Sequence, residues 1–111
     1  MELVNVYHLG GKQKALDMGV IWIGRPSPLG NPYSHLEGAN AILVPDREEA
    51  IRQYRIWLWN KIKEKDGLIL KALGQLKETD TLGCVCKPRS CHGDVIMKAW
   101  KWCREKGVLS S

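Results

Sequence analysis

Two short apolar runs, Val20–Ile23 and Thr81–Cys86, lie on either side of the longest helical pattern in the chain. Asp46 is suited to cap that helix, because Glu49 follows at the spacing of a capping box. The apolar positions of the helix are Ala50, Ile51, Tyr54, Leu58 and Ile62. Strands joined through a helix pair in parallel, with a right-handed crossover in nearly all proteins. The sequence therefore predicts an α/β fold with a mostly parallel sheet.

Four further segments complete the predicted order of elements. A first strand is expected over Glu2–His8, which is rich in β-forming residues and ends at paired glycines. Helices are expected over Gln13–Met18 and Leu68–Leu76, whereas Leu36–Val44 fits no single state. A last helix, stopped by Gly107, is also predicted. Its apolar face consists of Val95, Ile96, Ala99, Trp100 and Cys103.

The chain is expected to form a single small domain over residues 1–111. Its 111 residues, of which 44% are hydrophobic, suffice for one modest core and leave no room for a second. We expect a Rossmann-like, three-layer arrangement in which helices flank the parallel sheet. The strands ending near Ile23 and Cys86 then send their loops to the same carboxyl edge, where open α/β sheets bind ligands.

Charge and apolar pattern limit the classes of partner. A formal net charge of +5 and a pI near 9.1 favour an anionic partner such as a nucleotide, a nucleic acid or phosphate. The lysines are spread over several predicted helices, which is more typical of a solvated surface than of a nucleic-acid stripe. No segment approaches the roughly 18 apolar residues of a membrane span, and the N-terminus lacks a signal-peptide pattern. A cytoplasmic protein without a membrane partner is expected.

Two motifs carry a resemblance to a known family. They are GRPSPLGNPY, from Gly24 to Tyr33, and CVCKPRSCHGDV, from Cys84 to Val95, with a Tyr- and Trp-containing helix between them. In this order they resemble a small, functionally uncharacterised domain family of bacteria and their phages. The chain departs from that family's pattern at Val85, where Trp is common, and at Tyr33, where Phe is common. The resemblance implies that the two loops belong together, and a phage-encoded member would act in the host cytoplasm.

The second motif holds three cysteines and a histidine within nine positions, which suits a metal site. In a reducing compartment such a cluster indicates metal binding or catalysis more often than a disulfide. Zinc takes four thiolate or imidazole ligands in a tetrahedron. The candidate ligands are Cys84, Cys86, Cys91 and His92. Adjacent Cys91 and His92 are expected to point in different directions at a helix start, which counts against zinc as the cofactor.

The same motif also fits a reactive thiol, or packing alone. Amides at a helix N-terminus stabilise anions, so Cys91 at that position is a candidate nucleophile or proton donor. His92 and Asp94 are its candidate catalytic partners. Alternatively, Cys84 and Cys86 simply pack in the core, because free cysteines are among the most buried residues. The sequence leaves the metal, thiol and packing interpretations open.

The first motif is predicted to form a rigid ligand-binding loop. Its candidate ligand-binding residues are Gly24, Arg25, Gly30 and Asn31. The planar fork of Arg25 suits phosphate or carboxylate, and His35 is a further candidate for the pocket lining. The loop contains neither the GxxxxGK[ST] nor the GxGxxG phosphate-binding pattern. The alternative is a rigid connection in which Asn31 shapes the turn through its own backbone.

We therefore expect a protein that binds, and in a stronger form of the hypothesis modifies, a nucleotide-like or other anionic small molecule. The pocket is predicted between Gly24–His35 and Cys84–Asp94, side by side at the carboxyl edge of the sheet. The reaction type and the oligomeric state are left open, because spacing assigns no trio of nucleophile, base and orienting group. The alternative is a zinc-stabilised module that contacts nucleic acid or a protein partner.

Overall fold

The computed structural model describes residues 1–36, 41–85 and 91–109. Its strands are β1 (Glu2–Asn5), β2 (Ile21–Trp22), β3 (Tyr33–Ser34), β4 (Ile42–Leu43) and β5 (Thr81–Cys84). Its helices are the 3₁₀ helix η1 (Val6–Leu9) and the α-helices α1 (Lys12–Asp17), α2 (Arg47–Lys63), α3 (Gly67–Gly74) and α4 (His92–Glu105). The predicted α/β fold is confirmed, and a radius of gyration of 13.6 Å is that of one compact domain of this length.

Strand β5 is the centre of a three-stranded parallel sheet with the order β1-β5-β2. Leu82 of β5 lies between Leu3 of β1 and Ile21 of β2 in the strand register. All three strands run in the same direction, so the loops after β2 and β5 leave the sheet at its carboxyl edge. A separate pair of short parallel strands, β3 and β4, follows the first of these loops.

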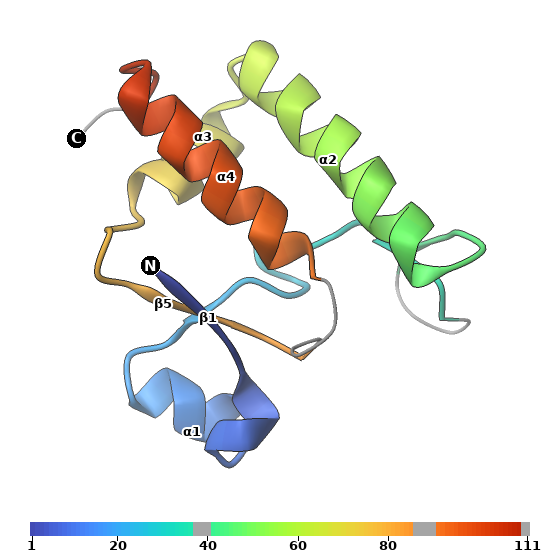
Figure 1. The fold of residues 1–111 in the computed structure, drawn as a ribbon, viewed down its shortest axis with the longest axis vertical. Helices are drawn as coiled ribbons and strands as arrows, with labels where there is room; N and C mark the ends of the chain where they lie inside the picture. The colour runs from blue at the N-terminus through green and yellow to red at the C-terminus, as the bar shows by residue number, and fades with distance from the viewer. Residues whose placement is uncertain (37–40, 86–90, 110–111) are drawn as a thin grey trace.

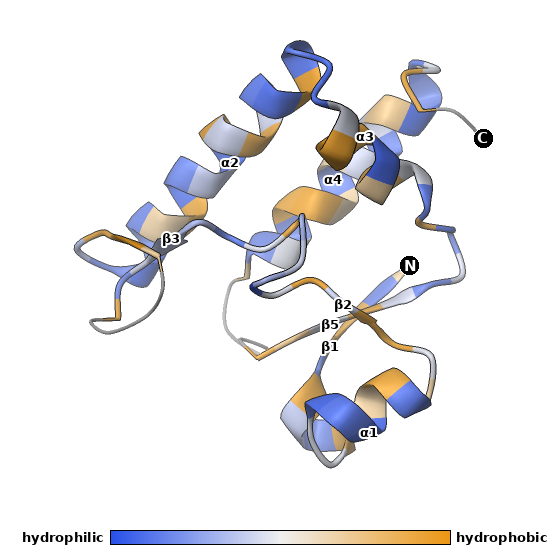
Figure 2. Ribbon diagram, turned by 180° about the vertical axis from the view of Figure 1, so that it is seen from behind, coloured by the Kyte–Doolittle hydropathy of each residue, from blue (hydrophilic) through white to orange (hydrophobic). Residues whose placement is uncertain are grey.

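Helices cover both faces of the main sheet (Figure 1). On one face, η1 and α1 place Val6 and Ala15 against Val20 in a small apolar cluster. On the other face, α2, α3 and α4 enclose the main core, and Figure 2 shows the same layers from behind. Fully buried members of that core include Ile23, Tyr54, Leu58, Leu73, Leu82 and Ile96. The expected three layers are present, although with three strands in the main sheet the likeness to a Rossmann arrangement is approximate.

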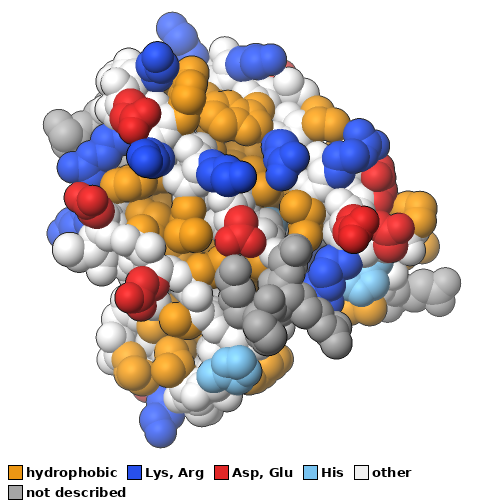
Figure 3. Space-filling view, viewed as in Figure 1, with side chains coloured by type: hydrophobic (Ala, Val, Ile, Leu, Met, Phe, Trp, Pro, Cys, Tyr) orange, Lys and Arg blue, Asp and Glu red, His pale blue; other side chains and the backbone are white. Residues whose placement is uncertain are grey.

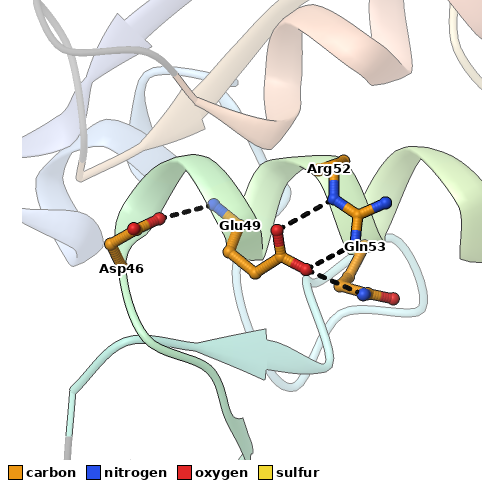
Figure 4. A network of polar contacts seen from close by, with 4 residues as sticks. All are labelled: Asp46, Glu49, Arg52 and Gln53. Atoms are coloured by element: carbon orange, nitrogen blue, oxygen red, sulfur yellow. Dashed lines mark hydrogen bonds and ion pairs between the residues drawn. The ribbon is translucent and has the colours of Figure 1, made fainter.

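The N-terminus of α2 begins at the predicted cap. An Asp46 carboxylate oxygen accepts the backbone N–H of Glu49 at 2.8 Å (Figure 4). The carboxylate of Glu49 binds Arg52, with N···O distances of 2.6 and 2.8 Å, and also Gln53 at 2.9 Å. The hydrogen bonds from Arg52 and Gln53 lower the pKa of Glu49 to about 2. This network fixes the first turns of α2, whose Arg47 reaches the cavity described below.

Three predicted strands were too long. The strand expected over Val20–Ile23 is reduced to Ile21–Trp22. The strand expected over Glu2–His8 ends at Asn5, because the Asn5 side chain accepts the Tyr7 N–H at 2.9 Å and caps η1. The strand expected over Thr81–Cys86 ends at Cys84, with Val85 in an exposed bend. Cys86 lies outside the described residues. The helical stop at Gly107 is confirmed, since its φ of 68° is in the left-handed region that favours glycine.

Basic side chains are scattered over the face formed by α2 and α4, between acidic and apolar ones (Figure 3). Within residues 1–36, 41–85 and 91–109, no helix combines the length and the apolar character that crossing a bilayer requires.

Candidate functional site

The described ends of the two motif loops lie near each other at the carboxyl edge of the sheet. His92, in the first turn of α4, places Nε2 2.7 Å from the carbonyl oxygen of Ile23, which directly precedes the Gly24 loop. Nearby, the Asn5 side chain donates to the carbonyl of Val85 at 3.4 Å. The predicted juxtaposition is therefore confirmed for the described residues of the two loops, and it follows from the parallel pairing of β2 with β5. Residues 86–90 of the second loop lie outside the described residues.

A cavity of about 410 Å³ lies between these loops. That volume is within the range of small-molecule binding sites. The charged and aromatic side chains that line it are Tyr7, Trp22, Arg25, Tyr33, His35, Arg47 and His92. None of the described residues that line it is Asp or Glu. The charge of the described lining thus favours an anionic occupant.

Helix α2 holds the Gly24–Pro32 loop in place. The hydroxyl of Tyr54, fully buried in α2, donates to the carbonyl of Leu29 at 2.7 Å. The amide of Asn31 donates to the carbonyl of Ala50 at 3.2 Å, and its side-chain oxygen accepts the N–H of Tyr33 at 2.9 Å. Asn31 therefore shapes the turn and also ties it to α2. A role of Asn31 in orienting a ligand stays a prediction.

Both glycines of the loop allow close approaches. A Cβ at Gly24 would lie 2.3 Å from the Trp22 ring, and one at Gly30 would lie 2.9 Å from the backbone nitrogen of Arg25. Arg25 closes the loop by donating from Nη1 to the carbonyl of Asn31 at 2.5 Å. This bond uses one of five guanidinium N–H groups, and Arg25 also lines the cavity. The packing accounts for both glycines without a ligand, so their binding role and that of Arg25 stay predictions.

Cys91 and His92 come together at the start of α4. Cys91 is the N-cap, is 1% exposed, and its Sγ accepts the N–H of Gly93 at 3.4 Å. The same Sγ lies 3.6 Å from Nδ1 of His92. The expectation that these neighbours point in different directions was wrong, because the extended backbone of the cap residue turns its thiol back over the first helical turn. Both residues line the main cavity.

The surroundings of His92 favour the neutral imidazole. Burial lowers the pKa of His92, and the positive charge of Arg25 acts in the same direction. The hydrogen bond to Ile23 and the negative charge of Asp94 oppose that shift. A carbonyl oxygen can only accept, so Nε2 carries the proton and Nδ1, which faces Cys91, is the basic nitrogen. The ring of Tyr54 packs edge-on against the imidazole, with centroids 5.1 Å apart.

Asp94 has a structural position beside this pair. Its carboxylate accepts the backbone N–H of Cys91 at 3.4 Å, which completes a capping box at α4. Asp94 is not among the described residues that line the main cavity. It lines a second cavity of about 150 Å³ between α2 and α4, together with Arg55 and Lys98. A catalytic role for Asp94 stays a prediction.

The structure describes three of the four candidate zinc ligands, namely Cys84, Cys91 and His92. Cys84 Sγ donates to the carbonyl of Val4 at 3.4 Å, whereas Cys91 and His92 are close neighbours. Among the residues that the structure describes, no three His, Cys, Asp or Glu side chains form a group that could hold a metal. Cys86, the fourth candidate ligand, lies outside them. Zinc binding by the four candidate ligands stays a prediction.

Several residues of the site were missed by the sequence reasoning. Tyr7 and Trp22 were assigned only to strands and Tyr54 only to an apolar helix face, and Arg47 was not singled out. A tyrosine within an apolar stripe is a usable signal, because a buried hydroxyl requires a hydrogen-bond partner. Trp22, two positions before the glycine-rich loop begins, is a similar signal. Tyr7 and Arg47 have no local signal, since only the tertiary fold brings them to the cavity.

No curated protein and no solved structure shows significant similarity to the chain. A family model, in contrast, matches residues 4–102, which include both loops and every described residue that lines the main cavity. The expected membership of an uncharacterised domain family is confirmed by this match. The chain belongs to the DUF4326 family, a domain of unknown function.

Proposed function

We propose that the protein binds a nucleotide-like or other anionic small molecule in the cavity between the two motif loops. The observation that carries this proposal is the lining, which combines Arg25 and Arg47 with aromatic rings and has no acidic side chain among the described residues. Arginine forms bidentate hydrogen bonds with phosphate and carboxylate groups. Aromatic faces bind flat rings such as nucleobases by stacking. A nucleotide contains both kinds of group.

The aromatic part of the lining is held in place before any ligand binds. The indole N–H of Trp22 donates to the carbonyl of Arg25 at 3.1 Å, and the ammonium of Lys12 lies 4.6 Å from the indole centroid. Arg47 is the first residue of α2, which begins at the Asp46 cap. A preorganised lining loses little conformational entropy on binding, which favours affinity. We also propose that the protein acts in the cytoplasm and that its source is a bacterium or a phage.

Calorimetric titration tests the proposal with three probes: a nucleoside monophosphate, the matching nucleoside and inorganic phosphate. The nucleotide should bind more tightly than either part alone. A charge-assisted hydrogen bond contributes about 1.5–3 kcal/mol, so Arg25→Gln and Arg47→Gln should each weaken nucleotide binding by about 10- to 150-fold. Lys63→Gln is the matched control, because it removes one charge from the exposed C-terminal end of α2. Equal affinity of all three variants would refute the arginine site.

A zinc-stabilised module that contacts nucleic acid or a protein is the second candidate. It is favoured by the 3.6 Å separation of Cys91 Sγ and His92 Nδ1, which puts two donors suited to zinc beside each other. Structural zinc contributes folding free energy, so a chelator should unfold such a module. Metal analysis of the purified protein, with circular dichroism before and after chelation, tests it. A metal-free, folded protein would reject this candidate.

A further inference from the structure

We propose that Cys91 and His92 form a nucleophile–base pair that hydrolyses or transfers a group of the ligand bound in the cavity. The inference rests on the proposed function for its substrate class, an anionic molecule with a leaving group on an electrophilic carbon. It goes beyond binding because it assigns a reaction. Three features carry it: the side-chain geometry, the position at a helix N-terminus inside a cavity, and access from a second cavity.

The structure brings together a nucleophile, a base and an orienting group, which the spacing of residues in the sequence could not assign. Cys91 Sγ lies 3.6 Å from Nδ1 of His92, within the reach of a sulfur hydrogen bond. Nε2 of the same ring is held 2.7 Å from the carbonyl oxygen of Ile23. That bond fixes both the tautomer and the direction of the ring, as the orienting group does in nucleophile–base pairs of hydrolases. Nδ1 is thereby positioned to take the proton of the thiol.

The local environment suits a thiolate that forms during reaction. The N–H of Gly93 donates to Cys91 Sγ at 3.4 Å, and the positive end of the α4 dipole points to the same atom. The guanidinium of Arg25 lines the same cavity as Cys91 and His92. Cys91 is therefore not an isolated buried cysteine, because a base, an amide donor and a cation share its surroundings.

Cys91 also lines the second cavity between α2 and α4. Arg55 and Lys98 give that cavity two cationic side chains, and Ile51 lines both cavities together with Cys91. Water or an acceptor with an anionic group can therefore approach the sulfur from a different cavity than the ligand occupies. This arrangement suits a two-step reaction through a covalent intermediate.

In the first step, Nδ1 of His92 takes the Cys91 thiol proton while Sγ attacks the electrophilic carbon of the ligand. The new S–C bond forms as the bond from carbon to the leaving group breaks, and the leaving group departs with the proton from Nδ1. In the second step, water or another acceptor hydroxyl attacks the same carbon and gives its proton to Nδ1. The S–C bond breaks, and the thiolate recovers that proton, so the thiol and the neutral imidazole are restored.

Alkylation of the thiols by iodoacetamide tests the pair without knowledge of the ligand. In this reaction the sulfur displaces iodide and releases a proton, as in the first step. Cys103 is the internal control, because it is 0% exposed, compared with 1% for Cys91, and burial raises its pKa. Trypsin releases Cys91 in residues 90–98, apart from the other cysteines, so mass spectrometry measures each rate. We expect Cys91 to react at least about tenfold faster than Cys103.

His92→Gln is the informative variant, because its amide nitrogen can still donate to Ile23 while no base faces Cys91. General bases contribute typically about 10²- to 10⁴-fold, so the alkylation rate of Cys91 should fall by about 100-fold or more. Cys91 reacting no faster than Cys103 in the folded wild-type protein would overturn the inference, whether or not the variant folds. Protection of Cys91 that a chelator relieves would overturn it too, because the sulfur would then be a metal ligand. Either result leaves nucleotide binding at Arg25 and Arg47 as a separate question.

Discussion

His92 reaches from the first turn of α4 to the carbonyl of Ile23, so one imidazole ring joins the two motif loops. The same ring packs against Tyr54, whose hydroxyl binds the Gly24–Pro32 loop from α2. Burial raises the pKa of Tyr54, so this hydroxyl keeps its proton and remains a donor. Two side chains thus hold the loop between α2 and α4. The site depends on this scaffold as much as on the residues that line it.

The lowered pKa of His92 predicts how stability depends on pH. In the unfolded chain the imidazole binds a proton near its ordinary pKa of 6.5, whereas the folded protein resists protonation. Below pH 6.5 the unfolded state therefore binds more protons, and the free energy of unfolding falls as pH falls. For one proton the slope approaches about 1.4 kcal/mol per pH unit until the lowered pKa is reached. Urea unfolding measured between pH 5 and 8 gives this slope.

His92→Gln supplies the control for that pH dependence. The variant lacks the titrating group, so the difference between the two stability curves isolates His92 from other acids and bases. The charged groups that act on this ring, Arg25 and Asp94, are the same in both proteins. Parallel curves for wild type and variant over this pH range would contradict the prediction.

The pairing of Cys91 with His92 could not be read from their adjacency in sequence. Neighbouring side chains diverge in a regular helix, and the sequence predicted a helix start without the conformation of the cap. With φ −141° and ψ 150°, Cys91 is extended, and this turns its thiol toward the following residue. The residue types alone identified Cys91, His92 and Arg25 as candidates, whereas the approach of Cys91 to His92 depends on the backbone conformation of the folded protein.

Among the elements, α2 and α4 were predicted well because each has a long apolar stripe and a side-chain cap. Strands β3 and β4 were not predicted, since each contains two residues and forms only by pairing with the other. Strand β5 shows why a central strand contains a glycine. A Cβ at Gly83 would lie 2.7 Å from Cγ1 of both Val6 and Val20. Glycine therefore lets η1 and the segment before β2 pack directly on the sheet.

Gly83→Ala should destabilise the protein by about 1–3 kcal/mol, the usual effect of overpacking. The neighbouring atoms belong to buried valines, whose branched side chains have few alternative rotamers. The measurement is the free energy of unfolding in urea. Gly67→Ala is the matched control, since no atom lies within 4 Å of its added Cβ and it is the first residue of α3. An equal effect of the two substitutions would disprove close packing at β5.

For the whole molecule, the meeting of the two loops was predictable from parallel topology, whereas the composition of the cavity was not. Strand order β1-β5-β2 brings loops that are distant in sequence to one edge. The cavity is also lined by Tyr7 from η1 and Arg47 from α2, and neither residue belongs to a motif. Their positions depend on how the helices pack against the sheet, which the apolar periodicity of the sequence does not specify.

Cys91→Ser distinguishes the metal, thiol and packing interpretations through the behaviour of the whole protein. Structural zinc contributes folding free energy on the order of 10 kcal/mol, so loss of one ligand should lower metal content and cost several kcal/mol of stability. The proposed nucleophile predicts another outcome. Serine accepts a hydrogen bond at an N-cap at least as well as cysteine, so the capping box with Asp94 should persist and stability should change by less than about 1 kcal/mol.

The readouts are metal content, the free energy of unfolding, nucleotide affinity and ligand turnover, measured on the same preparations of wild type and Cys91→Ser. Cys103→Ser is the control, because Cys103 is equally buried on α4 but lines neither of the two cavities around Cys91. If the proposed pair is correct, Cys91→Ser stays folded with unchanged metal content and binds nucleotide, but turns over no ligand. Replacing the larger sulfur of Cys103 by a hydroxyl in the core should instead destabilise the fold by about 1–3 kcal/mol. A stability loss at Cys91 as large as that at Cys103, with metal content unchanged, would mean that Cys91 only packs.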